Sequence, residues 1–278
     1  MTPDPIDSPL PNPVRPADPW VWAPLAAALA LLAAIYLTGS NTSLFLWLNG
    51  LTRLTGNALW THLTILGDGL VALVLLLPWV RRRPDVVWAG CLAGIATTLW
   101  VHGLKPVFAL PRPAEVLAPE LFQLLGPRDP SWAFPSGHST TIFALAGVIA
   151  LSIASRGLRL ALVLCAAAVA LSRVMVGAHW PADILAGAFG GWLCAVLGLR
   201  WAGRWTWGLG TFAQRLMATL LMIAAGVLLL SHETGYPETL PLQQAIAVLA
   251  LAAGLPLFLR RARLRPFRGE PGQRDQPE

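Results

Sequence analysis

The sequence predicts an all-α protein whose helices form a bundle that spans a membrane several times. Of its 278 residues, 55% are hydrophobic and only 12% are charged, and the mean hydropathy is +0.60. A soluble domain normally carries about 25% charged residues. The apolar runs are also longer than β-strands, so helices are expected to make the spans.

Eight apolar runs are bounded by charged, proline-rich or glycine-rich sequence and are therefore predicted to span the membrane. They cover residues 20–37, 63–80, 86–103, 139–154, 160–176, 184–199, 216–230 and 242–259. The last two are short, since a perpendicular span needs about 20 residues, but neither has the pattern of a soluble amphipathic helix. Between the first two runs, residues 44–54 alternate apolar and polar side chains, which predicts a short helix along the membrane surface.

The spans and their flanks divide the chain into four predicted parts. Residues 1–19 hold seven prolines and predict a disordered cytoplasmic tail that lacks the basic start of a signal peptide. Residues 20–200 contain six spans, and residues 201–259 contain a basic connector and two additional transmembrane helices. Residues 260–278 predict a basic, disordered cytoplasmic tail.

The formal net charge of +6 comes almost entirely from arginine, because Lys105 is the one lysine in the sequence. A basic protein can bind nucleic acid, but these arginines lie beside apolar spans. Membrane topology and anionic lipid head groups explain them more simply, so membrane lipids and not nucleic acid are the expected partners. Cys91, Cys165 and Cys194 each fall inside an apolar run, which predicts neither a disulfide framework nor a metal site.

The arginines also predict an orientation in the membrane. With eight spans, one side holds the larger group: Arg81–Arg83, Arg156, Arg159, Arg200, Arg204, Arg215 and the cluster at 260–268. The other side holds Arg53, Lys105, Arg112, Arg128 and Arg173. The first side is therefore expected to be cytoplasmic, together with both termini. The connections 104–138 and 172–183 then share the outer face.

One of these connections carries an unusual set of ionisable residues. Arg173, His179 and Asp183 lie between two apolar runs, and Pro181 suits the first turn of the following helix. Asp183 is then about one turn from His179, where its carboxylate can accept the proton of one imidazole nitrogen and leave the other nitrogen free. The alternative is a structural Arg–Asp pair with a histidine that packs against a helix end.

The other connection begins with Lys105 and Arg112, seven residues apart. On a helix this spacing places both cations on one face, about two turns apart. The alternative is an ordinary basic pair beside a membrane span.

The same connection ends with Pro135-Ser136-Gly137-His138, directly before an apolar run. Ser136 suits a helix cap, Gly137 allows a ligand to approach the backbone, and the free N–H groups of a helix start favour an anion. The alternative is a capped helix with an interfacial histidine. A separate ionisable residue, Asp68, lies near the start of the second span. It is either a functional group within the membrane or, as we favour, a cap that reaches water.

Together the three motifs offer three cations, backbone donors and two histidines, but no paired acidic cage for a divalent metal. Fixed cations and backbone donors can replace a metal in stabilising a phosphoryl group during transfer. In these motifs the chain resembles the type 2 phosphatidic acid phosphatase superfamily. Its signatures Lys-x6-Arg-Pro, Pro-Ser-Gly-His and Ser-Arg-x5-His-x3-Asp stand here in order and without substitution, within residues 105–183.

The resemblance implies a six-helix membrane core, a site at the non-cytoplasmic end, and a phosphohistidine mechanism that needs neither metal nor cofactor. It implies that His179 is the nucleophile, that Asp183 orients it, and that His138 protonates the leaving oxygen. The phosphate would be held by Lys105, Arg112, Ser136, Gly137 and Arg173. The two C-terminal spans have no counterpart in this core.

The expected function is therefore that of a multi-pass phosphatase in a bacterial inner membrane, which hydrolyses a lipid phosphate or diphosphate at the periplasmic face. Candidate substrates are polyprenyl diphosphate, phosphatidylglycerol phosphate, phosphatidic acid and a lipid A phosphate. The same residues suit a phosphotransferase with a lipid or sugar hydroxyl as acceptor. A non-catalytic lipid-binding or transport protein is the alternative from another class. Soluble haloperoxidases share the motifs, but the many apolar spans argue against them.

Overall fold

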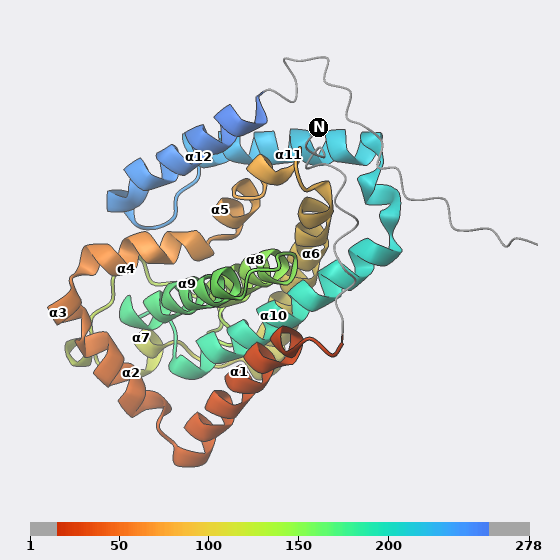
Figure 1. Cartoon of the computed structure of the whole chain (residues 1–278). Helices are drawn as coiled ribbons and strands as arrows, with labels where there is room; N and C mark the ends of the chain where they lie inside the picture. The colour runs from red at the N-terminus through yellow and green to blue at the C-terminus, as the bar shows by residue number, and fades with distance from the viewer. Residues whose placement is uncertain (1–15, 256–278) are drawn as a thin grey trace, which may run out of the picture.

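The computed structural model describes residues 16–255, and this part of the chain is built from helices without a β-strand (Figure 1). Residues 1–15 of the predicted N-terminal tail, the whole predicted tail at 260–278 and the end of the last predicted span lie outside the described residues. The α-helices are α1 (Pro19–Thr38), α2 (Asn41–Gly50), α3 (Thr52–Thr55), α4 (Asn57–Thr64), α5 (Gly69–Val74), α6 (Pro84–Phe108), α7 (Pro113–Val116), α8 (Gly137–Leu151), α9 (Arg156–Met175), α10 (Pro181–Arg204), α11 (Thr211–Leu230) and α12 (Leu240–Gly254). The 3-10 turns are η1 (Ile65–Gly67), η2 (Leu77–Trp79), η3 (Pro119–Leu121), η4 (Thr206–Leu209) and η5 (Pro237–Thr239).

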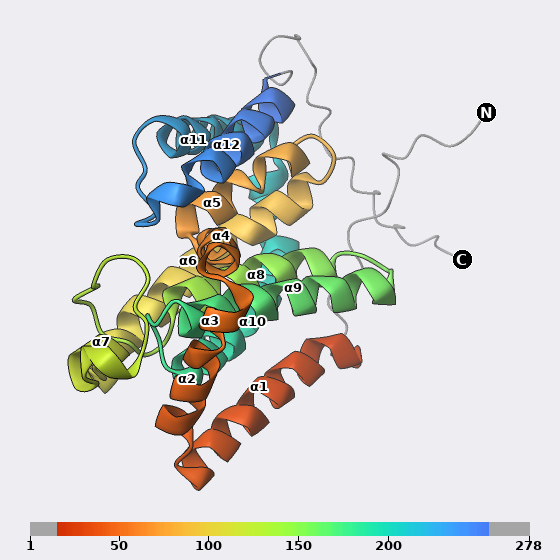
Figure 2. The same ribbon diagram turned by 90° about the vertical axis from the view of Figure 1, so that its left-hand side faces the viewer.

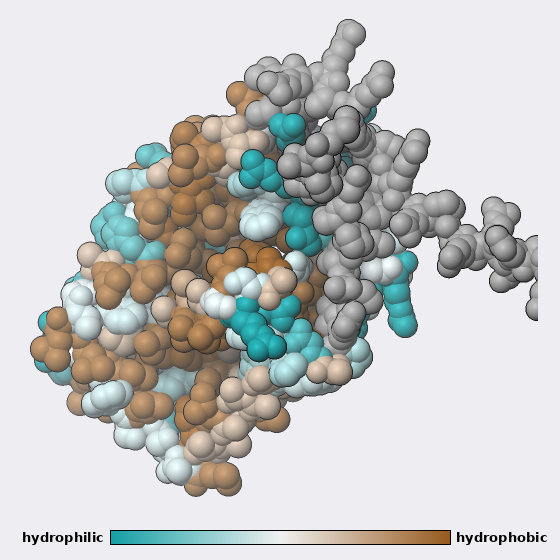
Figure 3. All heavy atoms as spheres, in the orientation of Figure 1, coloured by the Kyte–Doolittle hydropathy of each residue, from teal (hydrophilic) through white to brown (hydrophobic). Residues whose placement is uncertain are grey.

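Helix α10 lies at the centre of the bundle and packs against α8, α6 and α1 (Figures 1 and 2). Helix α9 packs on α8, while α11 and α12 form a hairpin that lies against α5. Of the apolar cores among the described residues, the two larger ones join α8, α9, α10 and α1, and α5, α6, α10 and the α11–α12 hairpin. Apolar side chains also cover much of the outer surface in Figure 3, as expected of helices that face lipid.

Every predicted span contains a helix, but the spans are less uniform than the sequence suggested. Within residues 16–255, five helices are long and apolar enough to cross a membrane, namely α1, α6 with its extension to Val116, α9, α10 and α11. The second predicted span is a broken pair, residues 57–67 and 69–79, bent by 62°. Helices α8 and α12 each contain 15 residues. Helix α2 provides the short helix predicted within residues 44–54.

The break in the second span occurs at Asp68, whose backbone is extended and whose carboxylate accepts hydrogen bonds from the N–H groups of Leu70 and Val71. The favoured interpretation of Asp68 as a helix cap is therefore confirmed. The residue before it, Gly67, approaches the helix α8 start so closely that a Cβ there would lie 2.9 Å from the Cβ of His138. The break thus allows the chain to pass directly beside His138.

Small residues on α10 allow its neighbours to pack at backbone distance. A Cβ at Gly187 would lie 2.7 Å from the Ser136 carbonyl oxygen, and one at Gly198 would lie 2.6 Å from the Ala89 carbonyl oxygen. Between these glycines, the fully buried Trp192 donates a hydrogen bond from Nε1 to the Trp20 carbonyl at 3.1 Å. Close backbone approach at small residues is a usual basis of helix packing in membranes.

The basic residues at one end of the bundle hold the helix ends together. Arg159 pairs with Asp18 at 2.8 Å, and Arg83 pairs with Asp85 at 2.9 Å while it reaches the Ser152 carbonyl. The connections 104–138 and 172–183 meet at the other end. The predicted grouping of these connections is therefore confirmed. The division of the chain at residues 200 and 201 stays a prediction, and helix α10 continues through it to Arg204.

The packing of α10 on α6 leads to a testable stability difference. We expect Gly198→Ala to destabilise the protein by about 1–3 kcal/mol, because the new methyl group must displace the α6 backbone at Ala89. Thermal unfolding of the purified protein in detergent would show a lower midpoint. The matched control is Gly203→Ala on the same helix, where nothing lies within 4 Å of the added Cβ. That variant should be neutral or slightly stabilised, and equal midpoints for both variants would contradict the packing argument.

Candidate active site

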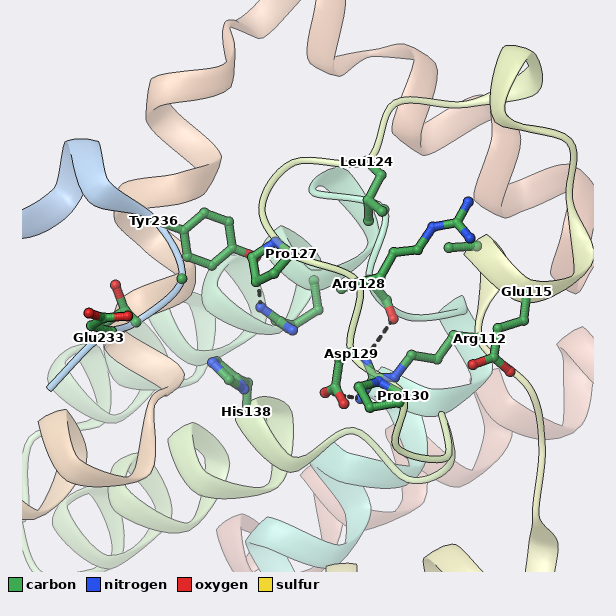
Figure 4. Close-up of a pocket in the computed structure, with 16 residues that line it drawn as sticks. Arg112, Glu115, Leu124, Pro127, Arg128, Asp129, Pro130, His138, Glu233 and Tyr236 are labelled. Carbon is green, nitrogen blue, oxygen red and sulfur yellow. Dashed lines mark hydrogen bonds and ion pairs between the residues drawn. The ribbon is translucent and has the colours of Figure 1, made fainter.

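Three loops remote in sequence enclose one pocket at the end of the bundle opposite the basic cluster. They are the α6–α8 connection (109–136), the α9–α10 loop (176–180) and the α11–α12 loop (231–239). The pocket has a volume of about 590 Å³. Figure 4 shows His138, Glu233 and Tyr236 on one side of it and Arg112, Asp129 and Pro130 on the other.

Lys105 and Arg112 meet in this site by a route that the sequence did not predict. Helix α6 ends at Phe108, and Ala109 takes a left-handed conformation, so Arg112 is not on the same helix face as Lys105. The chain instead turns back, and both cations donate hydrogen bonds to the Ser131 hydroxyl, at 2.8 Å from Lys105 and 3.0 Å from Arg112. The expected helix between them was wrong, whereas the expected proximity was right.

Arg112 is buried and its guanidinium is held from several directions. Nε donates to the Ser131 carbonyl at 2.8 Å, Nη1 donates to the Ala178 carbonyl at 2.9 Å, and Nη2 pairs with Asp129 at 2.6 Å. Burial raises the pKa of Asp129, but the Ser131 N–H and the charge of Arg112 outweigh it and hold that pKa below its usual range. The pocket thus contains a fixed cation, Arg112, that is already paired with an ionised carboxylate.

The Pro135–His138 motif forms the start of α8 as expected. Ser136 is fully buried and caps the helix, since its hydroxyl accepts from the Ser139 N–H at 3.4 Å. A Cβ at Gly137 would meet nothing closer than 3.8 Å, so the backbone there is accessible on one side. His138 follows in the first turn and lines the pocket. The N-terminus of α8 therefore points its free N–H groups at the same site as the cations.

His179 and Asp183 form the pair that the sequence predicted. Pro181 opens α10, and Asp183 lies in its first turn. Asp183 Oδ2 accepts from the Trp180 N–H at 2.8 Å and lies 3.2 Å from His179 Nδ1. Both side chains are buried, with 2% of each exposed. This arrangement supports the functional alternative, because the Asp183 carboxylate is paired with His179 and not with Arg173.

The free nitrogen of His179 faces the cations. Nε2 lies 3.2 Å from Arg112 Nη1, which identifies it as the acceptor and Nδ1 as the nitrogen that carries the proton toward Asp183. Burial, with the positive charges of Arg112 and Arg173, lowers the pKa of His179 well below its usual range. A neutral imidazole with an available lone pair is the form that can act as nucleophile or base.

Arg173 completes the cationic side of the pocket. It is buried, and its Nη1 donates to the Thr64 hydroxyl at 2.9 Å and to the Tyr236 hydroxyl at 3.3 Å. Its Nε has no hydrogen-bond partner among residues 16–255. The site thus has an additional donor that is not satisfied by the protein.

Several residues that position this site were missed in the sequence. Thr64 and Tyr236 hold Arg173, and Asp129 and Ser131 hold Arg112. Asn49 ties α2 to the end of α9 through the Met175 carbonyl at 3.0 Å. These residues belong to no motif. The one available signal was the polar stretch between the predicted spans 216–230 and 242–259.

Comparison with known proteins assigns the family. A family model described as the PAP2 superfamily matches residues 85–207. An undecaprenyl-diphosphatase from Sulfolobus acidocaldarius is 31% identical over 159 residues, which cover 56% of this chain and 75% of that protein. The chain belongs to the PAP2 superfamily. The predicted membership is therefore confirmed.

Other PAP2 relatives resemble parts of the chain. A lipid A 1-phosphatase from Rhizobium etli is 45% identical over 71 residues, so the match spans 25% of this chain and only 30% of that enzyme. The crystal structure of LpxE from Aquifex aeolicus shares 31% identity with a TM-score of 0.53, and the match covers 58% of this chain and 94% of that one. These PAP2 proteins establish the helical membrane fold and the family, while the α11–α12 hairpin lies outside the residues that the family model matches.

The PAP2 site predicts a specific protonation state for its central histidine. We expect the imidazole of His179 to remain neutral at pH 6, with the proton on Nδ1, because burial and the neighbouring cations disfavour its charged form. Nitrogen-15 histidine NMR of the protein in detergent micelles would test this, with His179→Gln used to assign the signal. A free imidazole titrates near pH 6.5.

The variant Asp183→Asn tests whether Asp183 determines the tautomer of His179. An amide at this position can offer its N–H₂ group to Nδ1, so the proton distribution of His179 should change while α10 remains folded. A wild-type signal that titrates at or above pH 6.5, or a tautomer that is unaffected by Asp183→Asn, would contradict the assigned geometry.

Proposed function

We propose that the protein is a lipid phosphatase that hydrolyses a lipid phosphate or diphosphate through a phosphohistidine intermediate. The observation that supports this most is the geometry of His179, which has Nδ1 on Asp183 and Nε2 facing a buried arginine inside the cationic pocket. Its PAP2 relatives include proteins named lipid A 1-phosphatase and undecaprenyl-diphosphatase. Lipid phosphates are therefore the proposed substrate class.

In the first proposed step, His179 Nε2 attacks the phosphorus atom and the bond from phosphorus to the leaving oxygen breaks. His138 donates a proton to that oxygen, so an alcohol or a phosphate leaves. Lys105, Arg112, Arg173, the Ser136 hydroxyl and the Gly137 N–H group stabilise the charge on the phosphoryl oxygens. Such electrostatic stabilisation is the main contribution expected in phosphoryl transfer.

In the second proposed step, water attacks the phosphorus atom of the intermediate on the side that the leaving group vacated. His138, now neutral, accepts a proton from this water, and the bond between phosphorus and Nε2 breaks. Inorganic phosphate leaves and His179 regains its lone pair. Each histidine thus returns to its starting state, and Asp183 holds the His179 ring in one orientation throughout.

The charge distribution favours a mechanism in which fixed cations hold the phosphate. Residues 16–255 contain no group of three His, Cys, Asp or Glu side chains placed to hold a metal ion. Lys105 and Arg112 instead share the Ser131 hydroxyl, and Arg112 touches His179. We propose that these cations serve the role that Mg²⁺ serves in other phosphoryl-transfer enzymes.

Phosphoenzyme trapping tests the mechanism. After rapid quenching with labelled substrate, the wild-type protein should carry label on histidine, and His179→Ala should carry none because the attacking atom is gone. Asp183→Asn should lower the rate by on the order of a hundredfold or more, because it weakens control of the His179 tautomer. Activity should survive a chelator, and vanadate should inhibit as a mimic of five-coordinate phosphorus.

His138→Ala separates the two histidines. This variant keeps the nucleophile but lacks the proton donor, so a nitrophenyl phosphate, which has a good leaving group, should be hydrolysed better than a lipid monophosphate. Failure to find label on His179 in both the wild type and His138→Ala would replace the covalent mechanism by direct attack of water.

We also propose that the pocket faces the periplasmic side of the inner membrane. The arginine-rich ends of the helices lie opposite the pocket, and basic residues favour the cytoplasmic side. Cysteines introduced at Arg82 and Glu120, in a protein without its three native cysteines, should differ in labelling by an impermeant thiol reagent on intact cells. Both positions are exposed at opposite ends of the bundle.

The expected result is labelling at residue 120 and protection at residue 82. Permeabilised cells serve as the control, because both cysteines should then react. Labelling at residue 82 alone in intact cells would reverse the proposed orientation.

A further inference from the structure

The α11–α12 loop contributes a wall to the pocket, although it lies outside the family region at 85–207. Glu233, Thr234, Gly235 and Tyr236 all line the cavity. The loop is fixed at its start by Gln243, whose Nε2 donates to the His232 carbonyl at 2.8 Å. The wall is therefore an ordered part of the site.

Two tight turns show that the α11–α12 loop packs closely against the α6–α8 connection. Gly126 and Gly235 both have positive φ, at 84° and 80°, a conformation that favours glycine. A Cβ at Gly126 would lie 2.8 Å from the Tyr236 ring, and a Cβ at Gly235 would lie 3.0 Å from Pro127. Each turn thus occupies the space that a side chain on the other would need, and the two loops interlock at the pocket rim.

Tyr236 connects this wall to the phosphate-binding cations. Its side chain is buried, and its hydroxyl accepts from Arg173 Nη1 at 3.3 Å. Arg173 Nη1 also donates to Thr64, so one nitrogen of the guanidinium is held by both α4 and the α11–α12 loop. Tyr236 is therefore placed to position Arg173.

Glu233 adds a carboxylate on the same side as His138 (Figure 4). It is exposed and forms no ion pair within the part of the chain that the structure describes, whereas Asp129 across the pocket is paired with Arg112. The lining residues Arg128 and Glu115 lie away from Glu233, near Arg112 (Figure 4). The His138 side of the pocket thus carries, beside the Arg173 guanidinium, a carboxylate that has no ion-pair partner among the described residues.

The direction of phosphoryl transfer determines which part of the substrate lies beside Glu233. The attacking and leaving atoms lie roughly in line on opposite sides of the phosphorus atom. His179 attacks from the side of the pocket on which Arg112 lies. The leaving group therefore occupies the side on which His138 and Glu233 lie. The Glu233 carboxylate disfavours an anionic leaving group beside it, whereas hydroxyl and amide groups find an acceptor in it.

We infer that the α11–α12 loop is a specificity-determining wall, in which Tyr236 positions Arg173 and Glu233 selects leaving groups that carry hydroxyl or amide donors over anionic phosphate. This inference rests on the proposed phosphatase function. It assigns as substrate a phosphate attached to a sugar or polyol head group of a lipid, in preference to a polyprenyl diphosphate. Selection arises partly from attraction and partly from repulsion of the competing substrate.

The test compares kcat/KM for a glycolipid 1-phosphate and a polyprenyl diphosphate in mixed micelles. Glu233→Gln should raise the diphosphate-to-glycolipid ratio roughly tenfold, because it removes the repulsion and weakens acceptance of donors. Glu238→Gln is the matched control, since it makes the same charge change in the same loop outside the pocket lining. Comparison of each variant with the wild type on the same substrate cancels differences between the lipid tails.

Four outcomes are decisive for Glu233. A ratio that rises for Glu233→Gln and stays constant for Glu238→Gln supports the inference. An unchanged ratio, or an equal rise in both variants, overturns it, as does a wild-type preference for the diphosphate. If the wild type hydrolyses no lipid phosphate at all, the proposed function itself is wrong, which is a distinct result.

Tyr236→Phe tests the positioning of Arg173 separately. Loss of the hydroxyl should raise KM severalfold for both substrates and leave their ratio unchanged, because Arg173 contacts the phosphate that both share. The other tyrosine of the chain, Tyr36, is exposed on α1, so Tyr36→Phe is the matched control and should leave KM unchanged. A KM for Tyr236→Phe equal to that of the wild type, with an unaltered thermal midpoint, would overturn the positioning role.

Discussion

The site depends on the hydrogen bonds to the Asp183 carboxylate, because one of its oxygen atoms both caps helix α10 and orients His179. Oδ2 accepts from the Trp180 N–H, which caps α10, and from His179 Nδ1, which orients the ring. The bundle and the histidine are therefore positioned together: α10 packs on α8 and α6, and His179 follows wherever α10 begins. A buried carboxylate is costly unless it is hydrogen-bonded in this way, so the local geometry leaves it few alternatives.

Much of this site could be predicted because its residues lie close together in the sequence. Pro181 and Asp183 identify the start of α10, and Ser136 and Gly137 identify the start of α8. Helix capping follows local rules, so a short stretch of sequence is sufficient to predict it. The apolar runs predicted the helices for the same reason, although not the 62° bend at Asp68, where a cap signal interrupts an apolar run.

What could not be predicted depends on contacts between distant segments. Arg112 lies beside Lys105 because residues 109–131 fold back, not because of helical spacing. Thr64 and Tyr236 reach Arg173 across 109 and 63 residues of chain. Neither residue is unusual in its own neighbourhood. Only the path of the chain through the bundle brings them to the guanidinium, and that path is determined by packing rather than by any local pattern.

Asp129 has a consequence for how the pocket exchanges its contents. Its carboxylate pairs with Arg112 at 2.6 Å while 47% of its side chain remains open to solvent. Under the proposed mechanism, an arriving phosphate would exchange one anion for another at Arg112 and would not bind to a bare cation. The same carboxylate would return when inorganic phosphate departs. Such a reversible substitution would avoid the tight product retention that an unopposed cluster of cations would cause.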